Sequence, residues 1–166
     1  GGKNLISQFE RTPKEGSVTL SGYDYSLNLN HKHVPEIKLW SGIKKDPTFL
    51  PTVGPYKQGM LVHVPLPLSQ IGKKVTASDI RQIYSEHYEN EKFVKVIESN
   101  YAEADDSLNP QALNGSNQLH LHLLYNQEKQ QFIVVAQLDN LGKGASGQCV
   151  QTVNSLIGVD EDTGLT

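Results

Sequence analysis

Two histidines separated by one lysine, His31 and His33, are the side chains best suited to acid–base chemistry in this sequence. They fall between a strand-like segment and a short helical segment, a position where binding and catalytic groups often lie. An imidazole titrates near neutral pH, so either ring can pass a proton to or from a reacting group. The spacing alone leaves a second interpretation open, an exposed His-Lys-His turn without a chemical role.

A second His-x-His pair, His120 and His122, raises the question of a metal site, because four imidazoles can hold zinc. The two pairs are distant in sequence, and no cysteine accompanies either of them. His120 and His122 alternate with leucines, which is typical of the polar face of a half-buried strand. We therefore predict no metal site and expect structural roles for His63 and His87.

The other dense feature is the glycine-rich run 139–147, Asp-Asn-Leu-Gly-Lys-Gly-Ala-Ser-Gly. Small residues open a helix here, and free backbone N–H groups at a helix N-terminus favour an anion or a polar ligand. Small side chains also let another surface approach closely. A tight loop, or a packing site for another domain, explains the run equally well. The single cysteine, Cys149, follows in an apolar-striped helix, where we expect it to be packed rather than nucleophilic.

The elements that position these residues follow from hydrophobic periodicity. Thr76 to Asp79 resembles a capping box, which places a helix start there, and the pair 119–123 and 132–138 reads as an antiparallel hairpin. The sequence predicts strands over 17–28, 49–53, 60–66, 93–97, 119–123 and 132–138, helices over 34–40, 77–89 and 144–157, and a loop over 99–117. The predicted fold class is α+β, with a largely antiparallel or mixed sheet and helices on one face.

Length and composition bound the function. The chain has 166 residues, which suits one domain, and its net charge of −3 does not favour nucleic-acid binding. No apolar run approaches the roughly 20 residues that span a bilayer. One cysteine permits no internal disulfide and favours a reducing compartment, so we expect a cytoplasmic protein. Dinucleotide-binding G-x-G-x-x-G, Walker and G-x-S-x-G motifs are absent. The Gly-Gly start without Met suggests a processed protein or a piece of a longer one.

Several motifs, in order along nearly the whole chain, resemble the C-terminal region of the N-acetyl-gamma-glutamyl-phosphate reductase family. The run 139–148 and its continuation to Gly158 are similar to the family's C-terminal signature. His-Lys-His-Val-Pro-Glu-Ile at 31–37 resembles its His-Arg-His-x-Pro-Glu-Ile segment. Further matches are Phe-Leu-Pro at 49–51, Gly-Met-Leu at 59–61, Thr-Gly-Leu at 163–165 and Gly-Gly-Lys at 1–3.

The resemblance implies a two-domain enzyme of arginine biosynthesis. In that family an NADP-binding Rossmann domain carries the catalytic cysteine, and a second domain resembling that of glyceraldehyde-3-phosphate dehydrogenase carries the histidine and the oligomer interface. The reaction is reduction of N-acetyl-glutamyl 5-phosphate to the 5-semialdehyde and phosphate, through a cysteine thioester. Residues 1–166 would be the second, substrate-binding and oligomerisation domain alone, without the Rossmann domain, and we expect this homo-oligomerising chain alone to be inactive.

Site residues carry over by position. A thioester mechanism needs an imidazole near the sulfur, and the resemblance assigns that role to His33, with His31 as the less favoured candidate. Glu36 would orient a neighbour or a substrate-binding cation. The remaining candidates are Lys3 and Lys57 for the substrate carboxylate or phosphate, and Asn140 and Gly144 for the nicotinamide half of NADP.

Two departures from the family pattern and two alternative functions accompany this interpretation. Gln58 stands where the family usually has Arg, so an anion contact is lost or moved to Lys57. Cys149 replaces a usual Ala in the last helix, which looks like tolerated packing. The alternatives are a non-catalytic binding or oligomerisation domain of the same fold, and a reductase of a related acyl phosphate.

Overall fold

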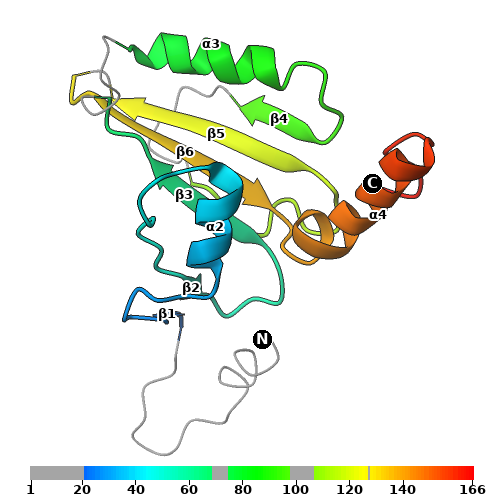
Figure 1. The fold of residues 1–166 in the computed structure, drawn as a ribbon, viewed down its shortest axis with the longest axis horizontal. Helices are drawn as coiled ribbons and strands as arrows, with labels where there is room; N and C mark the ends of the chain where they lie inside the picture. Colours follow the sequence, from blue (N-terminus) through cyan, green and yellow to red (C-terminus); the bar gives the residue numbers. More distant parts are fainter. Residues whose placement is uncertain (1–20, 69–74, 98–106, 127) are drawn as a thin grey trace, which may run out of the picture. The chain divides into compact units, whose positions relative to one another are not determined.

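The computed structural model describes residues 21–68, 75–97, 107–126 and 128–166 (Figure 1). The chain divides into two compact units, residues 1–57 and residues 58–166. Each unit is built around its own elements, and each carries one of the two features that the sequence singled out.

The first unit positions the histidines on a short helix. The strands β1 (Tyr23–Asp24) and β2 (Thr52–Val53) pair antiparallel, and α2 (His33–Ser41) lies between them in sequence. Gly42 ends α2 in the left-handed conformation, with φ of 71°. The predicted long strand over 17–28 is wrong within the described part, where β1 has only two residues; residues 17–20 lie outside it.

A turn interrupts that predicted strand. Ser26 and Leu29 have positive φ values of 56° and 57°, which no strand accommodates. The amide N–H of Leu29 donates to the carbonyl of Ser26, at 2.9 Å, and closes the turn. The near-alternating apolar residues of this segment are therefore a turn approaching the helix rather than a half-buried strand.

The second unit holds a four-stranded mixed sheet. The strands are β3 (Met60–Pro65), β4 (Val94–Ile97), β5 (Leu119–Asn126) and β6 (Gln131–Leu138), in the order β3-β6-β5-β4. The pairs β3–β6 and β5–β6 are antiparallel, which confirms the predicted hairpin, and β4–β5 is parallel. The predicted strand over 60–66 is confirmed as β3, which pairs with β6, whereas only Thr52–Val53 of the predicted strand 49–53 forms a strand, β2, which pairs with β1.

The core of the second unit lies between this sheet and α3 (Ala77–His87), which runs along one face in Figure 1. Alternate residues of β5 and β6 point to this face, as the period of two requires. The helix begins at Thr76 with a complete capping box, because Thr76 and Asp79 each bind the other's backbone N–H. The buried cluster comprises Leu68, Ala77, Ile80, Leu121, Leu123, Phe132 and Val134. The predicted α+β class with a mixed sheet is confirmed.

The last helix begins differently from the prediction. A π-helical turn over Gly142–Ser146 leads into α4 (Gly147–Ile157), and Gly158 ends it with φ of 75°. Cys149 is exposed, so the expectation of a packed thiol is wrong. The reason is that α4 turns its apolar stripe outward and its polar side toward the rest of the second unit. Among the described helices, none is long and apolar enough to cross a membrane.

Candidate functional site

The first residue of α2 carries an imidazole–carboxylate pair. Nδ1 of His33 lies 2.5 Å from Oε2 of Glu36, one helical turn later, and the side chains are 47% and 61% exposed. The sequence brings them together because residues three apart share a helix face. The hydrogen bond from His33 is the main cause that holds the pKa of Glu36 below its usual value. Glu36 therefore remains a carboxylate facing the ring.

The ring of His31 is fixed by its own contacts. Its Nδ1 accepts a hydrogen bond from the backbone N–H of His33, at 3.2 Å. An accepting Nδ1 carries no proton, so a neutral His31 holds its proton on Nε2. The rings of Tyr25 and Phe49 lie 5.6 and 5.2 Å from the His31 ring, and the His33 ring lies 4.8 Å away. His31, His33, Tyr25 and Phe49, which we call the ring cluster, come from three separate stretches of the first unit.

This geometry separates the chemical capacities of the two histidines. With Nδ1 of His33 held by a carboxylate, Nε2 is the nitrogen that can exchange a proton with a bound group, as in an oriented acid–base pair. His31 is held by backbone and aromatic neighbours and supports the ring of His33 from one side. Tyr25 and Phe49 were not predicted as site residues, although Phe49 begins one of the motifs that carried the resemblance.

The predicted substrate contacts are less constrained. Lys57 is exposed at the end of the first unit, and no contact between it and the ring cluster is present in residues 21–57. Lys3 lies outside the described residues. Both assignments stay predictions.

In the second unit, the glycine-rich run is organised around one buried carboxylate. Asp139 is 2% exposed. Oδ1 accepts from the backbone N–H groups of Leu141 and Gly142, at 2.9 and 3.1 Å, and Oδ2 accepts from Gly115 N–H and the Gln58 amide, both at 2.8 Å. Burial alone would raise the pKa of Asp139, but these four donors outweigh it and leave the pKa below its usual value.

Gln58 therefore has a definite role at the position where an Arg was expected. Its side chain joins the start of β3 to a residue 81 positions away. Sequence reasoning missed this pair, since nothing in the local pattern links the two segments. The departure from the family motif was the only signal that the position mattered.

The two candidate nicotinamide contacts also make structural bonds. Asn140 Oδ1 accepts from the N–H of Gly59 at 2.7 Å, and among the described residues its side-chain NH₂ makes no hydrogen bond. Gly59 has φ of 110°, and a Cβ there would collide with the Pro110 carbonyl, so only glycine fits. Gly144 donates its N–H to the carbonyl of Asp139 at 2.9 Å, so this N–H is not available to a ligand. Because Gly144 has no side chain, a ligand could still approach its backbone closely.

The second histidine pair is part of the sheet. His122 is 6% exposed, and its Nε2 lies 2.9 Å from Oε1 of Gln137 on the neighbouring strand. Burial is the main cause that lowers the pKa of His120, with smaller contributions from His122 and Lys95. Within the described residues, no three His, Cys, Asp or Glu side chains gather closely enough to hold a metal ion.

Comparison with known proteins identifies relatives across the chain. The family model for the semialdehyde dehydrogenase dimerisation domain matches residues 2–140. The N-acetyl-gamma-glutamyl-phosphate reductase of Trichormus variabilis is 37% identical over 99% of the chain and 53% of its own length. Reductase 2 of Pseudomonas putida is 41% identical over 95% of the chain and 50% of its own length, and the Brucella ovis reductase is 35% identical over 95% and 51%.

The chain thus spans about half the length of the curated relatives it matches. The predicted resemblance to this reductase family is confirmed, both by these relatives and by the domain that the family model describes. The mixed sheet with its covering helix is consistent with that domain. On this match over most of its length, the chain belongs to the semialdehyde dehydrogenase dimerisation-domain family.

Proposed function

We propose that this chain is the substrate-binding and oligomerisation half of a cytoplasmic NADP-dependent reductase that converts N-acetyl-glutamyl 5-phosphate to its 5-semialdehyde in arginine biosynthesis. The observation that carries the proposal is the His33–Glu36 pair, in a chain 35–41% identical to reductases of that name. A lone cysteine supports a reducing compartment. The family's dimerisation function supports self-association.

The chain's own contribution is proton transfer and positioning. Glu36 holds Nδ1 of His33 and so orients Nε2 toward the reacting group, where it exchanges the proton that carbonyl chemistry requires. His31, fixed by the His33 backbone and by Phe49, limits the rotation of the His33 ring. Lys57 and Lys3 remain our candidates for the substrate's anionic groups.

The residues present fit NADP in part. Asn140 keeps an amide NH₂ available beside the small residues of the run 142–147, so a flat polar ring can approach there. When bound, the cofactor supplies hydride to the acyl carbon. Most of its binding surface would belong to the half of the relatives that this chain does not span.

A chimera tests the proposal. The chain replaces the region of the Trichormus variabilis reductase that it matches, and NADPH oxidation is followed with N-acetyl-glutamyl phosphate. We expect turnover by the chimera, none by the 166-residue chain alone, and no comparable rate with aspartyl phosphate. Loss of turnover on His33→Asn, with turnover kept on His63→Asn, assigns the proton transfer. His63 is a suitable control because it is an exposed histidine on the edge strand β3.

A folded chimera that binds NADPH but reduces no acyl phosphate would overturn the proposed activity. Faster reduction of a different acyl phosphate would overturn the proposed substrate but leave the proposed reaction, reduction of an acyl phosphate, unchanged.

A further inference from the structure

The sequence has one Asn-Gly step, Asn114–Gly115, in the stretch between β4 and β5. Both residues are exposed, so water reaches them. Gly115 has φ of 79°, and a Cβ there would meet no atom within 4 Å, so the left-handed backbone rather than crowding requires the glycine. The same glycine leaves the backbone nitrogen at 115 without a side chain to shield it from the neighbouring amide of Asn114.

An asparagine before such a glycine can react with the chain itself. The backbone nitrogen of Gly115 loses its proton and bonds to Cγ of Asn114, the Cγ–Nδ2 bond breaks, and the departing NH₂ takes up a proton and leaves as ammonia. Water then opens the five-membered imide ring at one of its two carbonyls, which gives aspartate or isoaspartate. Ammonia is thus exchanged for water, and no oxidant or reductant takes part. This reactivity is one reason why asparagine counts among the thermolabile residues.

The structure opposes the first of these steps at the nitrogen. The N–H of Gly115 donates to Oδ2 of Asp139 at 2.8 Å, and Asp139 is a buried carboxylate that accepts four hydrogen bonds. Removal of the proton from Gly115 would place a negatively charged nitrogen beside a negatively charged oxygen, and burial makes this repulsion more costly. Asp139 therefore holds the nitrogen in its protonated, unreactive form.

The amide that the nitrogen would attack is held as well. Nδ2 of Asn114 donates to the backbone carbonyl of Gln58 at 3.1 Å. Oδ1 of Asn114 packs beside Gly59, where a Cβ would come within 3.0 Å of it. The amide therefore cannot change its orientation without losing the bond to Gln58, so both reacting groups are engaged by other parts of the second unit.

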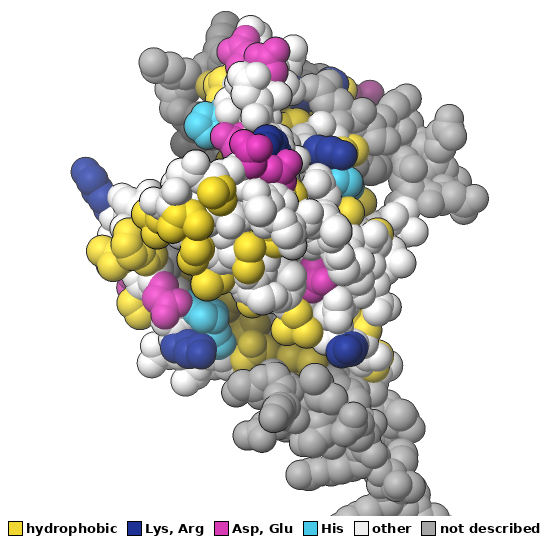
Figure 2. Space-filling view, turned by 90° about the vertical axis from the view of Figure 1, so that its right-hand side faces the viewer, with side chains coloured by type: hydrophobic (Ala, Val, Ile, Leu, Met, Phe, Trp, Pro, Cys, Tyr) yellow, Lys and Arg dark blue, Asp and Glu magenta, His cyan; other side chains and the backbone are white. Residues whose placement is uncertain are grey.

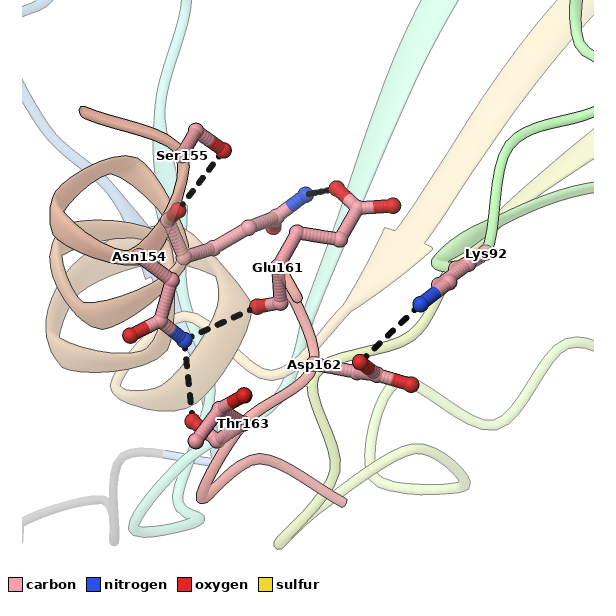
Figure 3. Close-up of polar contacts among 7 residues, drawn as sticks. Lys92, Asn154, Ser155, Glu161, Asp162 and Thr163 are labelled. Carbon is pink, nitrogen blue, oxygen red and sulfur yellow. Dashed lines mark hydrogen bonds and ion pairs between the residues drawn. The ribbon is translucent and has the colours of Figure 1, made fainter. Parts of the chain in front are cut away.

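The C-terminal turn fixes the other side of Gly115. Oγ1 of Thr166 donates to the carbonyl of Gly115 at 3.1 Å. The turn is itself fastened, because the side-chain NH₂ of Asn154 on α4 donates to two of its carbonyls, at 3.1 and 2.9 Å, and Lys92 pairs with Asp162 at 3.0 Å (Figure 3). Figure 2, viewed from the side on which α4 lies, shows acidic side chains gathered next to Lys or Arg side chains. The backbone around Gly115 is therefore held from two directions.

We propose that Asn114–Gly115 is a deamidation site that the folded loop keeps slow, with the carboxylate of Asp139 as the main restraint. Asp139 then has a second role besides ordering the glycine-rich run, since it also protects an exposed and chemically labile peptide. This inference goes beyond the proposed enzymatic function and does not depend on it.

The product of the reaction would weaken the loop that now restrains it. A carboxylate at position 114 has no N–H to donate to the carbonyl of Gln58, and its charge lies one residue from the bond between Gly115 and Asp139. Two like charges this close disfavour each other. Deamidation should therefore loosen the contacts of the loop with the start of β3 and with the glycine-rich run.

Peptide mass spectrometry of the 166-residue chain tests the proposal. The chain is incubated in mildly alkaline buffer, and exchange of NH₂ for OH is located by fragmentation. We expect conversion of Asn114 to be at least about tenfold slower in the folded chain than in urea, because restrained groups react only through local opening. The other asparagines, none of which precedes a glycine, should convert more slowly than Asn114 in urea. Equal rates for Asn114 in both conditions would overturn the proposed restraint.

Asp139→Asn isolates the part played by the carboxylate. It should speed conversion of Asn114 at least about fivefold, because deprotonation of Gly115 no longer meets a negative charge. Leu123→Ala is the matched control, since Leu123 is 1% exposed in the core and its truncation lowers stability without changing a residue of the loop. Both variants are compared at the same unfolded fraction, set with urea. Equal acceleration by the two changes would show that the reaction proceeds through unfolding and would overturn the role of Asp139.

Asn114→Asp reproduces one product of the reaction and tests its consequence. The variant should have a lower thermal midpoint than the parent, because it loses the bond to Gln58 and adds a charge near Asp139. A midpoint equal to that of the parent would show that the loop tolerates the modification, and the predicted loosening would be wrong.

Discussion

The segment around His33 and the loop around Asp139 hold polar side chains in opposite ways. The His33–Glu36 pair is about half exposed, and Nδ1 is the one ring nitrogen that is hydrogen-bonded within the part of the chain that the structure describes. Asp139 is 2% exposed, and each of its two carboxylate oxygens accepts two hydrogen bonds. A ring with a spare nitrogen at the surface can meet a substrate. A carboxylate with all its bonds used inside the protein can only organise the chain around it.

This difference shows how to decide which of two sequence motifs is more suited to catalysis and which to structural support. Both runs resemble motifs of the reductase family. In the glycine-rich run, however, the side chains of Asp139 and Asn140 accept hydrogen bonds from Gln58, Gly59 and Gly115. In the histidine segment the hydrogen bonds join residues close in sequence, and the imidazole of His33 stays accessible to solvent. We therefore propose acid–base chemistry in the first unit and a mainly structural role for the glycine-rich run in the second.

The largest effect should come from removing the exposed base. His33→Asn in the chimera should lower kcat by about 10²- to 10⁴-fold, the usual contribution of a positioned acid–base group. The thermal midpoint should stay within about 2 °C of the parent, because the side chain is 47% exposed and packs little. Stopped-flow NADPH oxidation and circular dichroism measure the two quantities. A retained kcat would mean that the segment around His33 is no more catalytic than the loop around Asp139.

Asp139→Asn should damage stability instead. The new NH₂ group would face N–H donors that now bind a carboxylate, and unfolding free energy should fall by about 3 kcal/mol. Urea titration of the isolated chain gives this value. Asp79→Asn is the control, because Asp79 also accepts hydrogen bonds, from the backbone N–H and the hydroxyl of Thr76, but lies exposed at the start of α3. Equal losses for the two variants would show that burial of Asp139 does not matter.

Acid should reveal the same carboxylate. The pKa of Asp139 is below its usual value in the folded chain, so its stabilising contribution is complete above the unfolded pKa of about 3.9. The contribution is lost as pH falls through the lower, folded-state pKa. The stability difference between the parent and Asp139→Asn should therefore shrink as pH falls from 5 toward 3 in urea titrations. A difference that grows on acidification would contradict the lowered pKa.

The smallest effect should come from the partner of the base. Glu36→Gln keeps a hydrogen-bond acceptor for Nδ1 of His33 but removes the charge. For an exposed pair we expect about a fivefold fall in kcat. The pH–rate profile of the chimera should also change shape, which a purely structural role for Glu36 would not cause. A loss as large as that of His33→Asn would mean that the carboxylate itself contacts the substrate.

Local hydrophobic periodicity was enough to predict the helices and strands whose own residues carry a clear pattern. The helix α3 follows from its capping box and apolar spacing, and the β5–β6 hairpin follows from two alternating runs joined by a polar turn. The helix predicted over 34–40 is present as α2 (His33–Ser41). These signals are local, and the structure confirms each of them.

What the sequence could not show depends on partners distant in the chain. The stripe on α4 was visible as a stripe, but periodicity does not say whether a helix turns it inward, and Cys149 was misplaced for that reason. The bond between Gln58 and Asp139 joins residues 81 positions apart, beyond any local pattern. The ring cluster likewise needed Phe49 to return beside His31.

The most direct test of the account measures kcat and unfolding free energy for His33→Asn and Asp139→Asn in the same chimera. The account predicts opposite outcomes: His33→Asn loses turnover and keeps its stability, whereas Asp139→Asn loses stability and its folded fraction, at low temperature, keeps turnover near the parent value. If Asp139→Asn abolished turnover in fully folded protein while His33→Asn remained active, the assignment of chemistry to the histidine segment would be contradicted.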